Sequence, residues 1–250
     1  MSPKVLVVLT SHGEIIDSSG KPIQKTGWYL CPTYTIEPAV NTFTIKPEFA
    51  HPYDVLAPKC EIVVASPKGG AAPLDPNSLQ PWVKDDSSSA NFFNNKKSLW
   101  ENTAKVSDFL GRADEFDALF YPGGHGPMYD LATDKDSIAL INEFWAKGKV
   151  VAAVCHGPAA FVNVTLPNGE NIMKGKEVSA FSNAEEDAVG MSKYMPFALE
   201  DKIKEDGAIF QKASEPWAPT VRVSGKLITG QNPNSAKGVG EAIASALGTF

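Results

Sequence analysis

Short apolar runs alternate with amphipathic stretches along the chain, which is typical of a parallel sheet with helices on both faces. Buried strands are predicted from short apolar runs at residues 4–11, 60–70, 117–126, 150–154 and 177–182. A further hairpin of strands is expected around Ser224 and Gly225. Helices are predicted by helical spacing or small-residue composition at 137–148, 196–207 and 234–250.

These elements predict an α/β fold of the doubly wound kind, with a mostly parallel sheet flanked by helices. The pattern has no internal repeat and no linker, so residues 1–250 are expected to form a single domain. Residues 75–110 are the least regular part. They are interpreted as a cap or lid, a dimer contact, or a plain surface excursion over one sheet edge.

The run VVAAVCHGPAA, at residues 150–160, is the most informative part of the chain. A buried strand is followed by Cys155 and His156, and then by a Gly-Pro pair that suits the start of a helix. Free N–H groups at such a helix start would face the sulfur and lower its pKa, as in a nucleophile elbow. Because adjacent side chains point apart, the imidazole is expected to meet a third group rather than the sulfur. A cysteine after a strand can also be a simple core residue.

The loop YPGGHG follows another predicted strand and should reach the same sheet edge, because ligands of doubly wound sheets bind at the carboxyl ends of the strands. Gly123 and Gly124 allow close approach of the backbone, and their N–H groups could hold an oxyanion beside Cys155. His125 could line the pocket. Without the neighbouring cysteine, the loop would be an ordinary glycine-rich turn.

Composition narrows the class of partner. The chain has 250 residues with 43% hydrophobic content, and its formal charge of −6, without a basic block, argues against nucleic acid. The apolar stretch at the N-terminus is too short for a signal peptide or a membrane span, so a cytoplasmic location is expected. Three cysteines suit neither a disulfide framework nor a zinc clip. His12, His51 and His125 show no metal-ligand spacing, so no metal is expected.

Four motifs carry a family resemblance: VCHGPAA, YPGGHGPMYDL, FSNAEEDAVG and LITGQNPNSA. Together they cover nearly the whole chain and resemble the ThiJ/PfpI superfamily. More narrowly, they are similar to its fungal class of heat-shock chaperones that act as glutathione-independent glyoxalases. The resemblance implies a flavodoxin-like fold related to class I glutamine amidotransferases.

The resemblance also implies site residues. The family's nucleophile falls on Cys155, its histidine on His156, and the acidic partner of that histidine on Glu186, with Glu185 as a close competitor. The family's N-terminal glutamate, which contacts the reactive sulfur, falls on Glu48.

One segment departs from the family pattern. The pieces GWYL and PEFAHP are separated by residues 31–46, which have no helical or strand period. We interpret this run as an insertion, or as an intron translated in frame. It holds Cys31 and Glu37, and neither is expected to be catalytic.

The implied activity is a lyase reaction, conversion of methylglyoxal or glyoxal to a hydroxy acid through a Cys155 hemithioacetal. Oxidation of one carbon and reduction of its neighbour cancel within the substrate, so no cofactor is expected. The resemblance further implies a homodimer in the cytoplasm or nucleus, with a stress-protective role and misfolded proteins as clients. Two alternatives stay open: a holdase chaperone or redox-sensing protein without turnover, and a small-substrate cysteine hydrolase.

Overall fold

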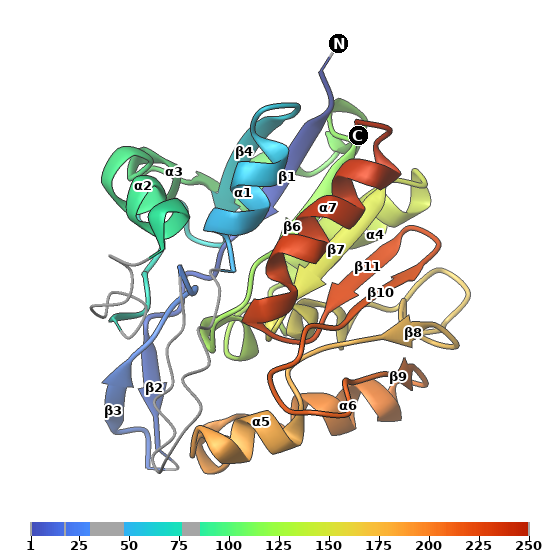
Figure 1. The fold of residues 1–250 in the computed structure, drawn as a ribbon. Coiled ribbons are helices and arrows are strands. Elements are labelled where there is room, and N and C mark those ends of the chain that lie inside the picture. The colour runs from blue at the N-terminus through green and yellow to red at the C-terminus, as the bar shows by residue number, and fades with distance from the viewer. Residues whose placement is uncertain (1, 18, 31–47, 77–85, 250) are drawn as a thin grey trace.

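A computed structural model describes residues 2–17, 19–30, 48–76 and 86–249 (Figure 1). The predictions made for residues 31–46, including those for Cys31 and Glu37, fall outside these ranges. Within the described helices, none is long and apolar enough to cross a membrane.

A seven-stranded sheet lies at the centre, in the order β10-β11-β7-β6-β1-β4-β5 (Figure 1). Its strands are β1 (Lys4–Val8), β4 (Glu61–Ser66), β5 (Ala104–Lys105), β6 (Ala118–Tyr121), β7 (Val150–Val154), β10 (Val221–Ser224) and β11 (Leu227–Gly230). All neighbouring pairs are parallel except β10 with β11, which form the antiparallel hairpin expected at Ser224 and Gly225. The mostly parallel, doubly wound fold is therefore confirmed.

Helices cover both faces of this sheet because its strands bury both sets of alternating side chains. On one face, Val5 and Val7 of β1 join a core cluster with α1 (Ala50–Leu56) and α7 (Ala236–Ala246). On the other face, Leu6 and Val8 join a second cluster with α4 (Lys135–Ala146). Figure 1 shows α1 and α7 side by side in front of the strands, with α4 behind them.

The smaller elements lie outside this sheet. A two-stranded antiparallel hairpin, β2 (Glu14–Ile16) with β3 (Pro22–Lys25), projects from its lower edge (Figure 1). The strand predicted at 177–182 is only two residues long, β8 (Glu177–Val178), and pairs with β9 (Ile209–Phe210) rather than joining the central sheet. After Val178 the backbone bonds elsewhere, because Ser179 N donates to Thr229 Oγ1 and Phe181 N donates to Cys155 O. Ser182 is then the N-cap of α5 (Asn183–Ala188), and α6 (Leu199–Glu205) follows.

Residues 86–110 are more regular than the sequence indicated. They contain α2 (Ser87–Asn95), α3 (Ser98–Glu101) and the edge strand β5. Phe92 and Trp100 are buried and stacked with ring centroids 5.4 Å apart, and both pack against Trp28. This part of the excursion therefore belongs to the core, while its role as a lid or dimer contact stays a prediction.

Candidate active site

Cys155 stands at the sharp bend that ends β7. Its backbone has φ 60°, a left-handed conformation that residues with a side chain rarely adopt. The Cys155 N–H donates to Gly230 O at 2.9 Å, and its carbonyl accepts from Phe181 N at 2.9 Å. These two bonds hold the strained bend, which costs on the order of 1 kcal/mol and is typical of functional sites. The elbow predicted from the sequence is therefore present.

The turn after the cysteine differs from the prediction. Residues Gly157–Phe161 form a 3₁₀ helix rather than the α-helix expected after the Gly-Pro pair. Such a short turn presents fewer aligned N–H groups to the sulfur than an α-helix does. The turn packs tightly on β6, because a Cβ at Gly157 would lie 2.2 Å from Tyr121 O.

His156 reaches the sulfur and a carboxylate at once. Its Nδ1 lies 3.3 Å from Cys155 Sγ, and its Nε2 lies 2.7 Å from Glu186 Oε2. The expectation that the imidazole would meet a third group is confirmed at Glu186, and the expectation that it would not reach the sulfur is wrong. The left-handed backbone at Cys155 breaks the alternation of the strand, so neighbouring side chains no longer point to opposite faces.

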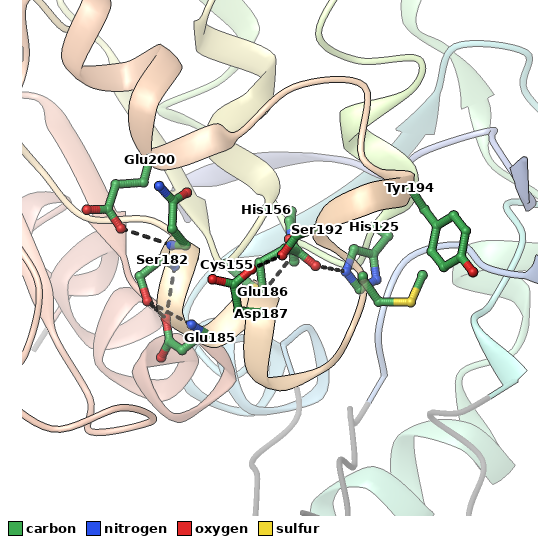
Figure 2. Close-up of polar contacts among 12 residues, drawn as sticks. His125, Cys155, His156, Ser182, Glu185, Glu186, Asp187, Ser192, Tyr194 and Glu200 are labelled. Carbon is green, nitrogen blue, oxygen red and sulfur yellow. Dashed lines mark hydrogen bonds and ion pairs between the residues drawn. The ribbon is translucent and has the colours of Figure 1, made fainter. Parts of the chain in front are cut away.

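Glu186 is the carboxylate partner, and it serves two histidines. His125 Nε2 lies 2.9 Å from Glu186 Oε1, so the two rings converge on one carboxyl group (Figure 2). Burial disfavours the charge of Glu186, but the facing histidines outweigh that effect and hold its pKa well below its usual range. The ionised carboxylate can only accept, so each histidine donates its Nε2–H.

The protonation of His156 follows from its surroundings. Burial lowers its pKa, although Glu186 opposes the change, so the ring is neutral at neutral pH. With the proton on Nε2, the lone pair of Nδ1 faces the Cys155 thiol. The imidazole is therefore placed to accept the thiol proton as a general base.

His125 lies behind His156, with ring centroids 4.3 Å apart, and is fully buried. Its Nδ1 lies 3.1 Å from the Tyr29 hydroxyl, within hydrogen-bond distance, while its Nε2 bonds to Glu186. Both ring nitrogens are engaged, and the substrate-binding role expected of His125 stays a prediction. Tyr29 was not predicted from the sequence as a site residue, although it belongs to the GWYL segment of the family pattern.

Glu48 lies against the reactive cysteine. A Cβ at Gly123 would be 2.2 Å from Glu48 Oε2 and 2.7 Å from Cys155 Cβ, so the three residues meet at one point. Burial raises the pKa of Glu48 to about 8, with smaller opposing effects of Cys155 and the Gly123 N–H. Neither carboxyl oxygen reaches hydrogen-bond geometry with a described residue. Glu48 is therefore protonated at neutral pH and has an O–H to donate.

The pKa of Cys155 corrects another expectation. Burial raises it well above its ordinary value, and a charge on Glu48 would raise it further, whereas the Gly124 N–H lowers it. A protonated Glu48 removes that charge and can donate to the thiolate instead. Ionisation of the sulfur therefore depends on the proton of Glu48 and on His156, not on a helix start.

The glycine loop comes close to the sulfur, as predicted. Gly124 has φ 91°, and a Cβ there would lie 2.3 Å from Gly27 O and 2.9 Å from Tyr29 N. Only glycine lets the two backbone segments approach this closely. Gly123 and Gly124 are thus brought beside Cys155, and their role as oxyanion donors stays a prediction.

Glu185 is bonded to groups other than the catalytic histidine and holds α5 in place. Its Oε2 accepts from Ser182 N at 3.0 Å and Ser182 Oγ at 2.7 Å. Its Oε1 accepts from Trp217 N at 3.1 Å, Gln231 Nε2 at 3.0 Å and Asn232 Nδ2 at 2.9 Å. This buried carboxylate ties α5 to the residues after β11, and so positions Glu186 next to it. The sequence left open whether Glu185 or Glu186 is the partner of His156, and the structure shows that it is Glu186.

The strained cysteine at the end of a central parallel strand, with its histidine and carboxylate, defines a doubly wound α/β protein with a nucleophile elbow. The chain belongs to the DJ-1/PfpI family, whose model matches residues 46–246.

This chain is similar to known relatives and to solved structures over most of its length. The chain is 29% identical over 252 residues to Glyoxalase 3 of Candida albicans, covering 97% of this chain and 98% of that protein. It is 31% identical over 217 residues to a glutathione-independent glyoxalase of Schizosaccharomyces pombe, covering 83% and 90%. The crystal structure of glyoxalase III from Candida albicans superposes with a TM-score of 0.81 at 30% identity, covering 98% and 97%. Rapid Encystment Protein 24 KDa of Francisella tularensis gives 0.83 at 35% identity, covering 98% and 99%.

Proposed function

We propose that this protein is a glutathione-independent glyoxalase that converts methylglyoxal to lactate. The observation that carries the proposal is the Cys155 sulfur 3.3 Å from the Nδ1 of a buried histidine that Glu186 orients. The names of the relatives point to the same activity. The substrate would be a small aldehyde, and the reaction would belong to the lyases.

In the first step, His156 Nδ1 accepts the Cys155 proton and the sulfur attacks the aldehyde carbon of methylglyoxal. A C–S bond forms, the carbonyl π pair moves to oxygen, and a hemithioacetal results. The N–H groups of Gly124 and His156 would hold the developing alkoxide. The Glu48 O–H lies beside the same sulfur and would stabilise the thiolate by a hydrogen bond before attack.

In the second step, a proton moves between the two substrate carbons. His156 first passes its proton to the alkoxide oxygen and then takes the proton from the former aldehyde carbon, while the Glu48 O–H protonates the ketone oxygen, and an enediol forms. The proton on His156 goes to the neighbouring carbon, and Glu48 recovers its proton from the hydroxyl of the first carbon. The first carbon is oxidised to a thioester while the ketone is reduced to an alcohol, so the electrons balance within the substrate. Water then cleaves the lactoyl thioester, which releases lactate and restores the Cys155 thiol.

A homodimer in the cytoplasm or nucleus, with a stress-protective or chaperone role, completes the proposal and rests on the family resemblance alone. A small-substrate cysteine hydrolase is the second candidate, because the same Cys155, His156 and Glu186 arrangement suits acyl transfer. The large apolar side chains that the described residues expose, Ile16, Ile23, Ile209 and Val223, lie on short strands and do not favour a holdase over catalysis.

The test follows lactate formation from methylglyoxal without glutathione and with a metal chelator present. The unaltered protein should form lactate, and Cys155→Ala should lose at least about a thousandfold in rate, because no other group supplies the covalent intermediate. Cys60→Ala is the matched control, since Cys60 is also a buried free thiol but opens β4 at the far end of the sheet.

The outcomes separate the candidates. Hydrolysis of an activated ester by a protein that forms no lactate would favour the hydrolase. A well-folded protein that turns over neither substrate would contradict both.

A further inference from the structure

We propose that His125, His156 and Glu186 form a binding site for a borderline divalent cation, for which Zn²⁺ is the best match. One ligand atom from each of the three residues lies within 4.8 Å of the other two, and Nε2 is the ring nitrogen that faces Glu186 in both histidines. The three side chains come from different parts of the chain, the YPGGHG loop, the elbow and α5. Their convergence is a product of the fold and has no counterpart in sequence spacing.

The donor set fits zinc. Two imidazole nitrogens and one glutamate oxygen make up a common three-ligand zinc site that leaves a fourth position open. The Nε2–H groups of His125 and His156 now meet Glu186 at 2.9 and 2.7 Å. Tetrahedral coordination at roughly 2.0–2.2 Å separates neighbouring ligand atoms by about 3.4 Å. A cation in place of these two protons would therefore move its ligands apart by about half an ångström.

The second nitrogen of each ring faces an atom that can accept a hydrogen bond. His125 Nδ1 lies 3.1 Å from the Tyr29 hydroxyl, and His156 Nδ1 lies 3.3 Å from the Cys155 sulfur. Each ring can therefore move its proton from Nε2 to Nδ1 and keep both nitrogens satisfied. Histidines that bind metals are oriented in this way, by a partner on the other nitrogen.

The site is reached from the side of α5. Glu186 lines a cavity of about 210 Å³ together with Ser182, Asp187 and Ser192, and this cavity gives a cation and its water a route to the carboxylate. The Cys155 sulfur faces the opposite nitrogen of the His156 ring, so it is not part of the proposed ligand set. This separates the site from the usual capture of zinc by a reactive thiol.

Occupation of the site would stop catalysis reversibly, a consequence that rests on the proposed function. With zinc on Nε2, His156 carries its proton on Nδ1 and cannot accept the proton of Cys155. Lactate formation should fall as zinc is added and return when a chelator removes it.

The binding test uses the full chain after chelator treatment and measures zinc by competition with a chromogenic indicator. One zinc per chain is expected, with Mg²⁺ unable to compete because it prefers oxygen ligands. His125→Gln and Glu186→Gln should weaken binding by about tenfold or more. His12→Gln and His51→Gln are matched controls that should bind as before, because His12 stacks on Tyr129 and His51 pairs with Asp86.

X-ray absorption on the zinc-loaded, unaltered protein supplies the decisive readout, and it does not depend on how the variants fold. Two imidazole nitrogens and oxygen, without sulfur, are expected. Cys155→Ser keeps a hydrogen-bonding partner for His156 Nδ1 and should bind zinc equally well. Zinc–sulfur scattering, loss of binding in Cys155→Ser, or no stoichiometric binding would overturn the site. A protein that binds zinc in this way but forms no lactate would contradict the glyoxalase proposal and leave the zinc site standing.

Discussion

Glu48 is a buried acid whose proton links the chemistry of the site to the stability of the fold. Its pKa rises from 4.5 to about 8, chiefly because burial disfavours the carboxylate. Between these values the folded protein holds a proton that the unfolded chain has released. The contribution of this proton is complete below the unfolded pKa and is lost as the pH rises through the folded pKa.

Replacing this acid with an amide should therefore flatten the dependence of stability on pH. In the unaltered protein, this group removes on the order of 1 kcal/mol of unfolding free energy for each pH unit in that interval. Glu48→Gln has no proton to lose, so its stability should decline less steeply. Urea unfolding at the two ends of the interval measures the difference. Equal slopes for the two proteins would show that Glu48 ionises normally in the fold.

For single residues of the site, the sequence identified the nucleophile but not every side chain that acts with it. Cys155, the two glycines and Glu48 were identified from motifs, and the structure brings them together. Glu185 and Glu186 could not be separated, because adjacent residues of a short helix differ by about 100° in direction and either could face the histidine. The orientation of α5 decides this, and Glu185 itself helps to set it.

Among the elements, the elbow between β7 and the turn at Gly157–Phe161 is the most constrained. A Cβ at Gly157 would lie 2.2 Å from Tyr121 O and 3.3 Å from the Ala153 side chain. The first contact is with backbone, so the turn itself must shift. The sulfur two residues earlier in the chain would shift with it.

Gly157→Ala should therefore destabilise the fold by about 1–3 kcal/mol and slow alkylation of Cys155. Gly238→Ala in α7 is the matched control, since its new Cβ meets no backbone atom and only the side-chain Cγ2 of Val221 at 3.1 Å. Its effect should stay within about 1 kcal/mol, because alanine favours a helix more than glycine does. Thermal unfolding and thiol labelling measure both effects. A Gly157→Ala protein that matches the control in both would show that the elbow tolerates a side chain.

Element prediction succeeded where the signal was local and failed where contacts between distant segments intervened. The central strands and α4 appear where apolar patterning placed them, and α6 and α7 where end signals and small residues placed them, within a few residues. The strand expected at 177–182 stops at Val178, because Ser179 N bonds to the Thr229 side chain and Phe181 N to the Cys155 carbonyl. In residues 86–110, polar runs concealed two helices whose apolar residues, such as Phe92, pack into the core.

For the whole molecule, the net charge of −6 argues against nucleic acid as a partner. Phosphate backbones bind proteins through clustered lysine and arginine, and this chain has no such block. We expect no shift of DNA or RNA in a gel at low salt, where electrostatic binding is strongest. Binding that weakens steeply with added salt would contradict this prediction.

The sequence by itself determined the doubly wound architecture, because periodic burial of apolar residues depends on local order alone. It also located the bend that carries Cys155, since strand, glycine and proline signals are local. The tertiary structure alone decided that His156 reaches the sulfur and that Glu186, rather than Glu185, receives both histidines. It also decided that Glu48 keeps its proton. These features depend on distances between segments far apart in the chain and on the exclusion of water. Neither can be deduced from the order of the residues alone.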